Sequence, residues 1–245
     1  KEKFAITTHV RPDGDGIGSS LGLCWLLRSL DKDAEVIIRD EIPNSYGQLP
    51  GKEEIRRVTA IDDDYDAVFV MECSSVDRPG IKGLEDEFVV NIDHHATCES
   101  FGTINWIDST ASAVGEMIYN LCKAIGGRVT PEIAECLYMA IVTDTGSFHY
   151  PNTTERTLKV ASELVKAGVK PSNISEAVYN NYSWSRVSLM QKVMATIRRN
   201  DEGNVAFMRQ TQEMGEDSGA VDGDNNGFVN LPLVAKEVVA SVYMR

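Results

Sequence analysis

The sequence has few positive charges and no cysteine pattern typical of a metal site or a disulfide framework. Its 245 residues carry 24 Lys and Arg against 37 Asp and Glu, a net charge of −13. Such a chain does not neutralise the phosphates of long nucleic acid, which argues against that partner and leaves a short anionic ligand held through metal ions. The five cysteines form no CxxC pair, which predicts buried thiols in a reducing compartment.

Long hydrophobic runs and internal repeats are also missing. No apolar stretch approaches the roughly 18 residues of a membrane span, and the opening KEKFAITT lacks the hydrophobic centre of a signal peptide. These absences predict a soluble, cytoplasmic protein without a membrane partner. With 42% hydrophobic residues, the chain can form a proper core in one large domain or in two unequal ones.

Short apolar runs alternate with helical patterns over the first three quarters of the chain. The strand-like runs are 4–9, 34–39, 66–72, 87–93 and a weaker one at 102–107. The helical patterns are 18–30, 111–125, 131–142, 154–167 and 172–181. Runs that are apolar on both faces and separated by helices predict an α/β fold, with a parallel Rossmann-like sheet and helices on both of its faces.

A polar stretch, NNYSWSRVS at 180–188, predicts a boundary between two domains. We expect a first domain over 1–182, a linker at 183–190 and a smaller α/β domain over 191–245. In the second region, the stretches 188–199, 204–210 and 237–244 suggest a smaller unit with its own strands.

The second region also contains a predicted polar loop, 215–227. Asp222, Asp224, Asn226 and Gly227 match the first positions of an EF-hand calcium loop. Position twelve of that motif falls on Leu233 instead of a bidentate glutamate, so we interpret the stretch as an acidic turn.

Polar residues follow the predicted strands of the first domain. The glycine-rich stretch THVRPDGDGIGSS, residues 7–19, lies where a strand passes into a helix. Because the carboxyl ends of parallel strands meet at one edge of a sheet, we expect the polar residues at these ends to lie together. They are His9, Asp13 and Asp15 after the first strand, Glu72 after the third, and Asp93, His94 and His95 after the fourth; Asp144 lies where a helix ends.

Several carboxylates in one cleft repel each other unless a positive charge lies among them. Mixed imidazole and carboxylate ligands suit Mn²⁺ and similar ions, and two such ions about 3.5 to 4 Å apart clamp a phosphoryl group. Taken singly, each residue also fits an ordinary turn or core position, but their combination at successive strand ends favours a metal site. A dinucleotide-binding loop fits poorly, because Ser19 stands where its third glycine belongs.

Four segments resemble, in order and approximate spacing, the four motifs of the DHH phosphoesterase superfamily. They are HVRPDGDGIGSS, VFVMECSSVDRPG, IDHHAT and VTDTGSFHYPNTT. The TDTGSF turn and the tail NGFVNLPL…VVASVYMR are similar to the oligoribonuclease (NrnA, nanoRNase) branch, whose members carry a C-terminal DHHA1 domain. The resemblance implies hydrolysis of short oligoribonucleotides and of 3′-phosphoadenosine 5′-phosphate (pAp) with two divalent ions. Mn²⁺ is the expected metal, Mg²⁺ and Co²⁺ are alternatives, and a homodimer is the candidate assembly.

The resemblance also implies roles for single residues. His9 and Asp13 would hold one ion, and Asp15, His94 and Asp144 the other. Glu72 would bridge the two ions from a position where the family has Asp. The substrate and catalytic roles would fall to His95 and Arg78, which contact phosphates, to Ser19, which contacts substrate, and to Asp93, which orients a ligand histidine.

The end of the chain departs from the family pattern. Family members carry a GGGH-type glycine-rich segment and a basic strand late in the DHHA1 domain, and neither occurs before Arg245. We therefore expect a partial DHHA1-like substrate domain beside an intact metal site. A cyclic-dinucleotide or pApA phosphodiesterase and a catalytically impaired nucleotide-binding domain remain alternatives. The TDTGSF turn and the tail disfavour a family II pyrophosphatase, and the net charge disfavours an exonuclease of long DNA.

Overall fold

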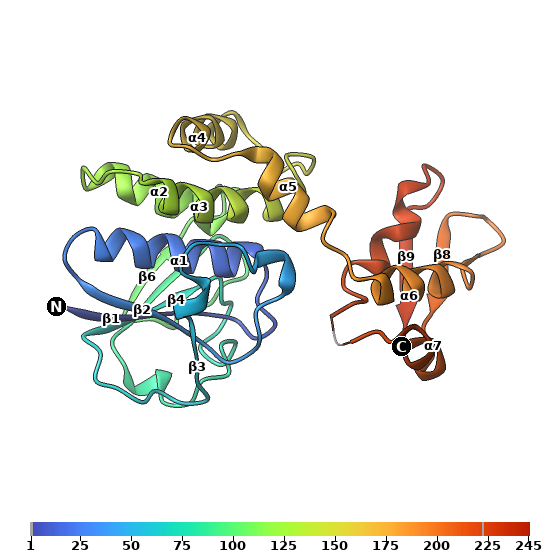
Figure 1. Cartoon of the computed structure of the whole chain (residues 1–245), viewed down its shortest axis with the longest axis horizontal. Coiled ribbons are helices and arrows are strands. Elements are labelled where there is room, and N and C mark those ends of the chain that lie inside the picture. Colours follow the sequence, from blue (N-terminus) through green and yellow to red (C-terminus); the bar gives the residue numbers. More distant parts are fainter. Residues whose placement is uncertain (1, 222) are drawn as a thin grey trace. The chain divides into compact units, whose positions relative to one another are not determined.

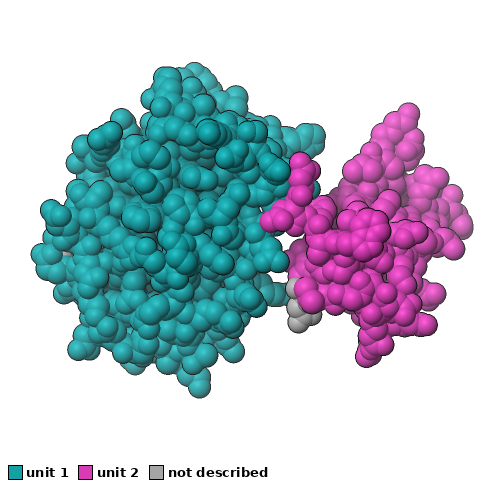
Figure 2. All heavy atoms as spheres, viewed as in Figure 1, with its two compact units in different colours: residues 1–179 teal, residues 180–245 magenta. Residues whose placement is uncertain are grey.

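The computed structural model describes residues 2–221 and 223–245, and the chain divides into two compact units, 1–179 and 180–245 (Figure 2). The sequence suggests a linker at 183–190, but these residues lie largely within helix α6 (Trp184–Met194). Leu189 and Val193 on this helix are buried in the core of the second unit. The polar residues around them conceal this spacing of four in the sequence.

A six-stranded parallel sheet forms the centre of the first unit (Figure 1). Its strands are β1 (Lys3–Thr8), β2 (Asp33–Ile38), β3 (Arg56–Arg57), β4 (Ala67–Met71), β5 (Val89–Asp93) and β6 (Ile104–Ile107). They lie in the order β3-β2-β1-β4-β5-β6, and every pairing is parallel. The predicted parallel α/β sheet is confirmed. The strand order reverses between β1 and β4, which is where open α/β sheets bind ligands.

Alternate strand residues enter two separate hydrophobic cores. Phe4 and Ile6 of β1 pack in one core with helices α1 (Gly14–Arg28), α2 (Val114–Ala124) and α3 (Pro131–Asp144). Ala5 packs in the other core, where the cover comes from the 3₁₀ helix η3 (Leu84–Asp86) and neighbouring loops. Among the described residues, α-helices therefore cover one face of the sheet. The other face is covered by loops and by the single turn of η3.

Helix α1 begins at Gly14, four residues before its predicted start. The Asp13 side chain caps it by accepting a hydrogen bond from the Gly16 N–H at 2.9 Å. A Cβ at Gly18 would lie 2.5 Å from the Cys136 carbonyl oxygen. The glycines that suggest a turn in the sequence instead allow α1 to approach α3 closely, which brings the first and last predicted motifs together.

Two further helices, α4 (Glu155–Lys166) and α5 (Pro171–Tyr179), complete the first unit (Figure 1). The predicted start of α3 is confirmed, with Thr130 as the cap and Pro131 at its first position. Thr154 caps α4 in the same way. The short 3₁₀ helices η1 (Asn44–Tyr46) and η2 (Lys52–Glu54) lie between β2 and β3.

The second unit is a three-stranded sheet with helices α6 and α7 (Gln212–Ser218) and the 3₁₀ helix η4 (Phe228–Val234). Its strands β7 (Arg198–Arg199), β8 (Val205–Arg209) and β9 (Ala240–Met244) lie in that order. The predicted loop at 215–227 begins inside α7, and Asp222 lies outside the described residues. Within the described part of the chain, no helix is both long and apolar enough to cross a membrane.

Candidate metal centre

His9 follows β1 at the point where the strand order reverses. Its Nδ1 lies 2.9 Å from the Val10 carbonyl oxygen, so this nitrogen donates to the backbone. Its Nε2 faces two carboxylates, 3.6 Å from Asp13 Oδ1 and 3.8 Å from Glu72 Oε2. Metal-binding histidines usually donate the ring N–H that does not bind the metal to a carbonyl or a carboxylate, and His9 has this orientation.

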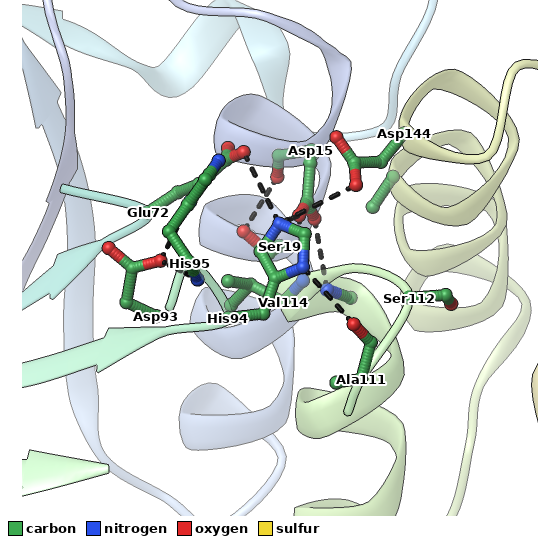
Figure 3. A network of polar contacts seen from close by, with 12 residues as sticks. Asp15, Ser19, Glu72, Asp93, His94, His95, Ala111, Ser112, Val114 and Asp144 are labelled. Carbon is green, nitrogen blue, oxygen red and sulfur yellow. Dashed lines mark hydrogen bonds and ion pairs between the residues drawn. The ribbon is translucent and has the colours of Figure 1, made fainter. Parts of the chain in front are cut away.

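His94 follows β5 and repeats the arrangement (Figure 3). Its Nδ1 lies 3.2 Å from the Ala111 carbonyl oxygen, and its Nε2 lies 3.5 Å from Asp144 Oδ2. Nε2 is also 3.8 Å from Asp15 Oδ2 and 3.9 Å from Glu72 Oε1. These separations suit ligands that share one ion, because each ligand atom then lies about 2 Å from the metal.

Six predicted ligands come together in two groups that share one residue. The ligand atoms of each group lie within 4.8 Å of one another. The groups are His9, Asp13 and Glu72, and Asp15, Glu72, His94 and Asp144; a further grouping joins Glu72, His94 and His95. Because Glu72 presents Oε2 to His9 and Oε1 to His94, its carboxylate lies between the two groups.

Two buried polar atoms of this centre make no hydrogen bond within the described part of the chain, although buried polar atoms in proteins normally make one. Glu72 is 5% exposed, and its Oε2 has no hydrogen-bond partner among the described residues, nor does His94 Nε2. Leaving such groups unpaired is costly, and a divalent cation between them would satisfy both. The backbone of Glu72 also adopts the left-handed region, with φ at 57°. Strain of this kind concentrates at functional sites. The residues present therefore fit a divalent metal ion.

The Asp15 carboxylate is fully buried at the start of α2. Its Oδ2 accepts from the Val114 N–H at 2.6 Å and its Oδ1 from the Gly115 N–H at 2.9 Å (Figure 3). Burial, together with the charges of Glu72 and Asp144, nevertheless raises the pKa of Asp15 well above its usual value. Burial likewise raises the pKa of Asp144 to about 6. Without a cation, the centre accumulates mutually repelling carboxylates.

Both inward-facing histidines take up a proton when no metal is bound. Burial lowers the pKa of His9, but the neighbouring carboxylates of Asp13 and Glu72 outweigh burial and raise it to about 10. Burial also lowers the pKa of His94, and the surrounding carboxylates raise it to about 10. A metal ion would have to displace these protons.

Asp93 and His95 form a separate pair beside the ligand groups. Asp93 Oδ1 accepts from the His95 backbone N–H at 2.7 Å and from its ring Nδ1 at 2.9 Å. The histidine that Asp93 orients is therefore His95, whereas the sequence suggests a metal ligand in this role. This hydrogen bond raises the pKa of His95, whose side chain is 51% exposed. His95 can thus present a protonated Nε2 to solvent.

The two remaining predicted contacts lie in different surroundings. Arg78 is exposed in the segment after β4, and its carbonyl oxygen accepts from the Val10 N–H at 2.9 Å. This bond ties the segment to the loop that carries His9. Ser19 is fully buried on α1, and its hydroxyl donates to the Asp15 carbonyl at 2.6 Å. The structure thus places the Ser19 hydroxyl inside the helix packing.

Sequence reasoning missed the residues that form hydrogen bonds with the backbone of Asp144 and with Ser112. Asn152 Nδ2 donates to the Asp144 carbonyl at 3.1 Å and to the Ser112 carbonyl at 3.0 Å. Glu116 is fully buried and accepts a hydrogen bond from the Ser112 hydroxyl at 2.5 Å. The sequence gives no capping-box signal here, because Ser112 stands four residues before Glu116 and the capping box requires three.

Residues 3–141 match the sequence pattern of the DHH family, N-terminal domain. The chain belongs to the DHH family. The DHH match contains five of the six predicted ligands, and Asp144 follows three residues after its end.

Two curated relatives of this DHH chain carry the same name. The chain is 34% identical to the bifunctional oligoribonuclease and PAP phosphatase NrnA of Thermus thermophilus, over 98% of this chain and 71% of that protein. It is 31% identical to the NrnA of Bacillus subtilis, over 80% of this chain and 66% of that protein. A solved structure, an exopolyphosphatase-related protein from Bacteroides fragilis, superimposes with a TM-score of 0.91 at 30% identity. That match covers 99% of this chain and 75% of the other.

Proposed function

We propose that this chain is a metal-dependent phosphoesterase that hydrolyses short oligoribonucleotides and 3′-phosphoadenosine 5′-phosphate. The observation that carries the proposal is the pair of ligand groups that share Glu72 where the strand order of the sheet reverses. Both reported NrnA relatives are named for these two activities, and one of them matches over 98% of this chain. The second unit would serve as the DHHA1-like substrate domain.

The donor set favours Mn²⁺, because imidazole and carboxylate ligands without thiolate suit this ion. His9, Asp13 and Glu72 would hold one ion, and Asp15, Glu72, His94 and Asp144 would hold a second. Ions bound there would supply charge for the phosphoryl oxygens and a water of lowered pKa.

The chain's own residues would bind the phosphate and move the proton. His95 keeps Nδ1 bonded to Asp93, so its Nε2 is the atom that would donate a proton to the departing oxygen. Arg78 is exposed beside the loop that carries His9, where a guanidinium would bind a second phosphate group.

A hydrolysis assay with Mn²⁺ tests this proposal. The substrates are pAp, a labelled dinucleotide, pApA, a cyclic dinucleotide and pyrophosphate. We expect turnover of the dinucleotide and pAp, and a loss of at least about 100-fold in His94→Ala, because one ligand group then loses its imidazole. The matched control is His149→Ala, which removes an exposed histidine outside the ligand groups.

Circular dichroism verifies that both variants remain folded. Turnover of pApA or the cyclic dinucleotide alone would reassign the substrate. Unchanged activity in His94→Ala would reject the metal centre. Mn²⁺ binding without turnover of any substrate would identify a binding domain instead of an enzyme.

A further inference from the structure

A short backbone segment, residues 111–115, connects to three of the proposed ligands. The Ala111 carbonyl accepts from His94 Nδ1 at 3.2 Å, and the N–H groups of 114 and 115 donate to the Asp15 carboxylate at 2.6 and 2.9 Å (Figure 3). The carbonyl of residue 112 accepts from Asn152, which also donates to the backbone of Asp144. The position of the 111–115 segment therefore sets the orientation of His94 and Asp15.

One buried carboxylate outside the ligand groups holds this segment. Glu116 is 0% exposed, and its Oε2 accepts from the Ser112 hydroxyl at 2.5 Å and from the Ser112 N–H at 3.3 Å. Glu116 belongs to none of the ligand groups found among the described residues. Its carboxylate is thus engaged with the segment and is separate from the proposed ligands.

Helix α4 supplies a positive charge that offsets the cost of burying the Glu116 carboxylate. Arg156 forms an ion pair with Glu116 through its Nε, and the Thr157 hydroxyl donates to Glu116 Oε2 at 3.0 Å. A buried carboxylate that is paired and fully hydrogen-bonded holds its neighbours in one arrangement, whereas removing a partner leaves groups unsatisfied. The chain thus fixes the 111–115 segment between the metal centre and α4.

We propose that Glu116 is a positioning residue for the metal centre. It holds the 111–115 segment so that the Ala111 carbonyl orients His94 and the amides at the start of α2 bind Asp15. The inference rests on the proposed function, because it assigns the purpose of this network to metal binding. Loss of comparable supporting residues behind metal ligands costs about 10- to 100-fold in metal affinity.

Calorimetric titration with Mn²⁺ alone tests this inference without any substrate. We expect Glu116→Gln to bind Mn²⁺ about 10- to 100-fold more weakly than the unmodified chain. Glu35→Gln is the matched control, because Glu35 also accepts from an arginine and a hydroxyl, those of Arg56 and Tyr65, in a network that includes no proposed ligand. We expect the control to lose thermal stability but to keep its Mn²⁺ affinity.

The metal-free protein gives a second readout through the imidazole resonances of His94. In Glu116→Gln, the nitrogen resonances of His94 should shift as its bond to Ala111 changes, while those of His149 should remain. Ser112→Ala removes the 2.5 Å hydrogen bond alone and should weaken Mn²⁺ binding in the same direction. This variant decides the question if Glu116→Gln does not fold.

Equal Mn²⁺ affinity in Glu116→Gln and Glu35→Gln, with unshifted His94 resonances, would overturn the inference. If the unmodified chain binds no Mn²⁺, the proposed function fails. The His94 resonances then still report whether Glu116 positions the segment, so the two failures are distinguishable.

Discussion

Asp93 and His95 form a closed hydrogen-bonded pair through a single carboxylate oxygen. Asp93 Oδ1 accepts both the backbone N–H and the ring Nδ1–H of His95, at 2.7 and 2.9 Å. Burial raises the pKa of Asp93, but these bonds outweigh it and hold the carboxyl in its ionised form. The negative charge in turn favours the protonated imidazole, which is the form that a general acid needs.

Replacing His95 separates its role from metal binding. We expect His95→Gln to lower kcat by about 10²- to 10⁴-fold, because positioned acids contribute about that much, while Mn²⁺ affinity stays within a few-fold. Steady-state kinetics and calorimetric titration measure the two quantities. A His95→Gln variant with full kcat would show that proton transfer to the leaving group occurs elsewhere.

Replacing Asp93 should shift the pH dependence. Hydrogen bonding to Asp93 raises the pKa of His95, so Asp93→Asn should lower it. An acid acts only below its own pKa, and the fall of kcat on the alkaline side should therefore move to lower pH. The pH profile of kcat measures this shift. An unchanged alkaline limb would assign that limb to another group.

Glu72 illustrates a trade of stability for function. Its backbone is left-handed, a conformation that costs most residues about 1 kcal/mol or more and that Asn tolerates better. Its Oε2 is also buried and makes no hydrogen bond among the described residues. His9 and His94 pair with Glu72 while they are protonated, so the effect of the backbone is isolated above pH 10, where both imidazoles are neutral. There we expect Glu72→Asn to raise the melting temperature of the metal-free protein by about 2 to 4 °C. At neutral pH it should weaken Mn²⁺ binding at least tenfold.

Arg11→Asn is the control for the backbone contribution. Arg11 also has a left-handed backbone, with φ at 54°, and its side chain is exposed outside the ligand groups. It should gain stability without losing Mn²⁺ affinity. A lower melting temperature in Glu72→Asn above pH 10 would contradict the interpretation that the Glu72 backbone is strained.

The strand ends were predictable because their signal is local. Apolar runs followed by His9, by Glu72 and by His94 place polar groups at carboxyl ends, and parallel pairing brings those ends together. The partner of Asp93 was not predictable, because a sequence with two adjacent histidines does not show which imidazole forms a hydrogen bond with the preceding aspartate. The network of Glu116 was hidden because its arginine lies 40 residues away, on a helix whose packing the sequence does not specify.

The start of α1 shows a different limit of sequence reasoning. Glycines at 14, 16 and 18 favour a turn when read locally, because glycine weakens a helix interior. In the folded chain, close contact with α3 outweighs this preference, since a side chain at Gly18 would collide with the Cys136 carbonyl. Such a contact between distant segments carries no local sequence signal.

The histidines of the ligand groups also predict how stability depends on pH. In the metal-free protein the pKa of His9 and of His94 is about 10, against 6.5 for an unperturbed histidine. A base whose pKa is raised by folding stabilises the fold. Its full contribution is present when the pH is below the unperturbed pKa, and it disappears as the pH rises towards the folded-state pKa of about 10. The melting temperature in EDTA should therefore fall from about pH 6.5 to pH 10.

Saturating Mn²⁺ should reduce this fall, because the ion replaces the two protons as the positive charge among the carboxylates. Binding at pH 8 should accordingly release about two protons, which calorimetry in buffers of different ionisation enthalpy counts. His9→Gln and His94→Gln should each reduce the release by about one, whereas His149→Gln should not change it. Release of no protons at pH 8 would mean that both imidazoles are already neutral in the metal-free protein, and would contradict the charge state deduced for this centre.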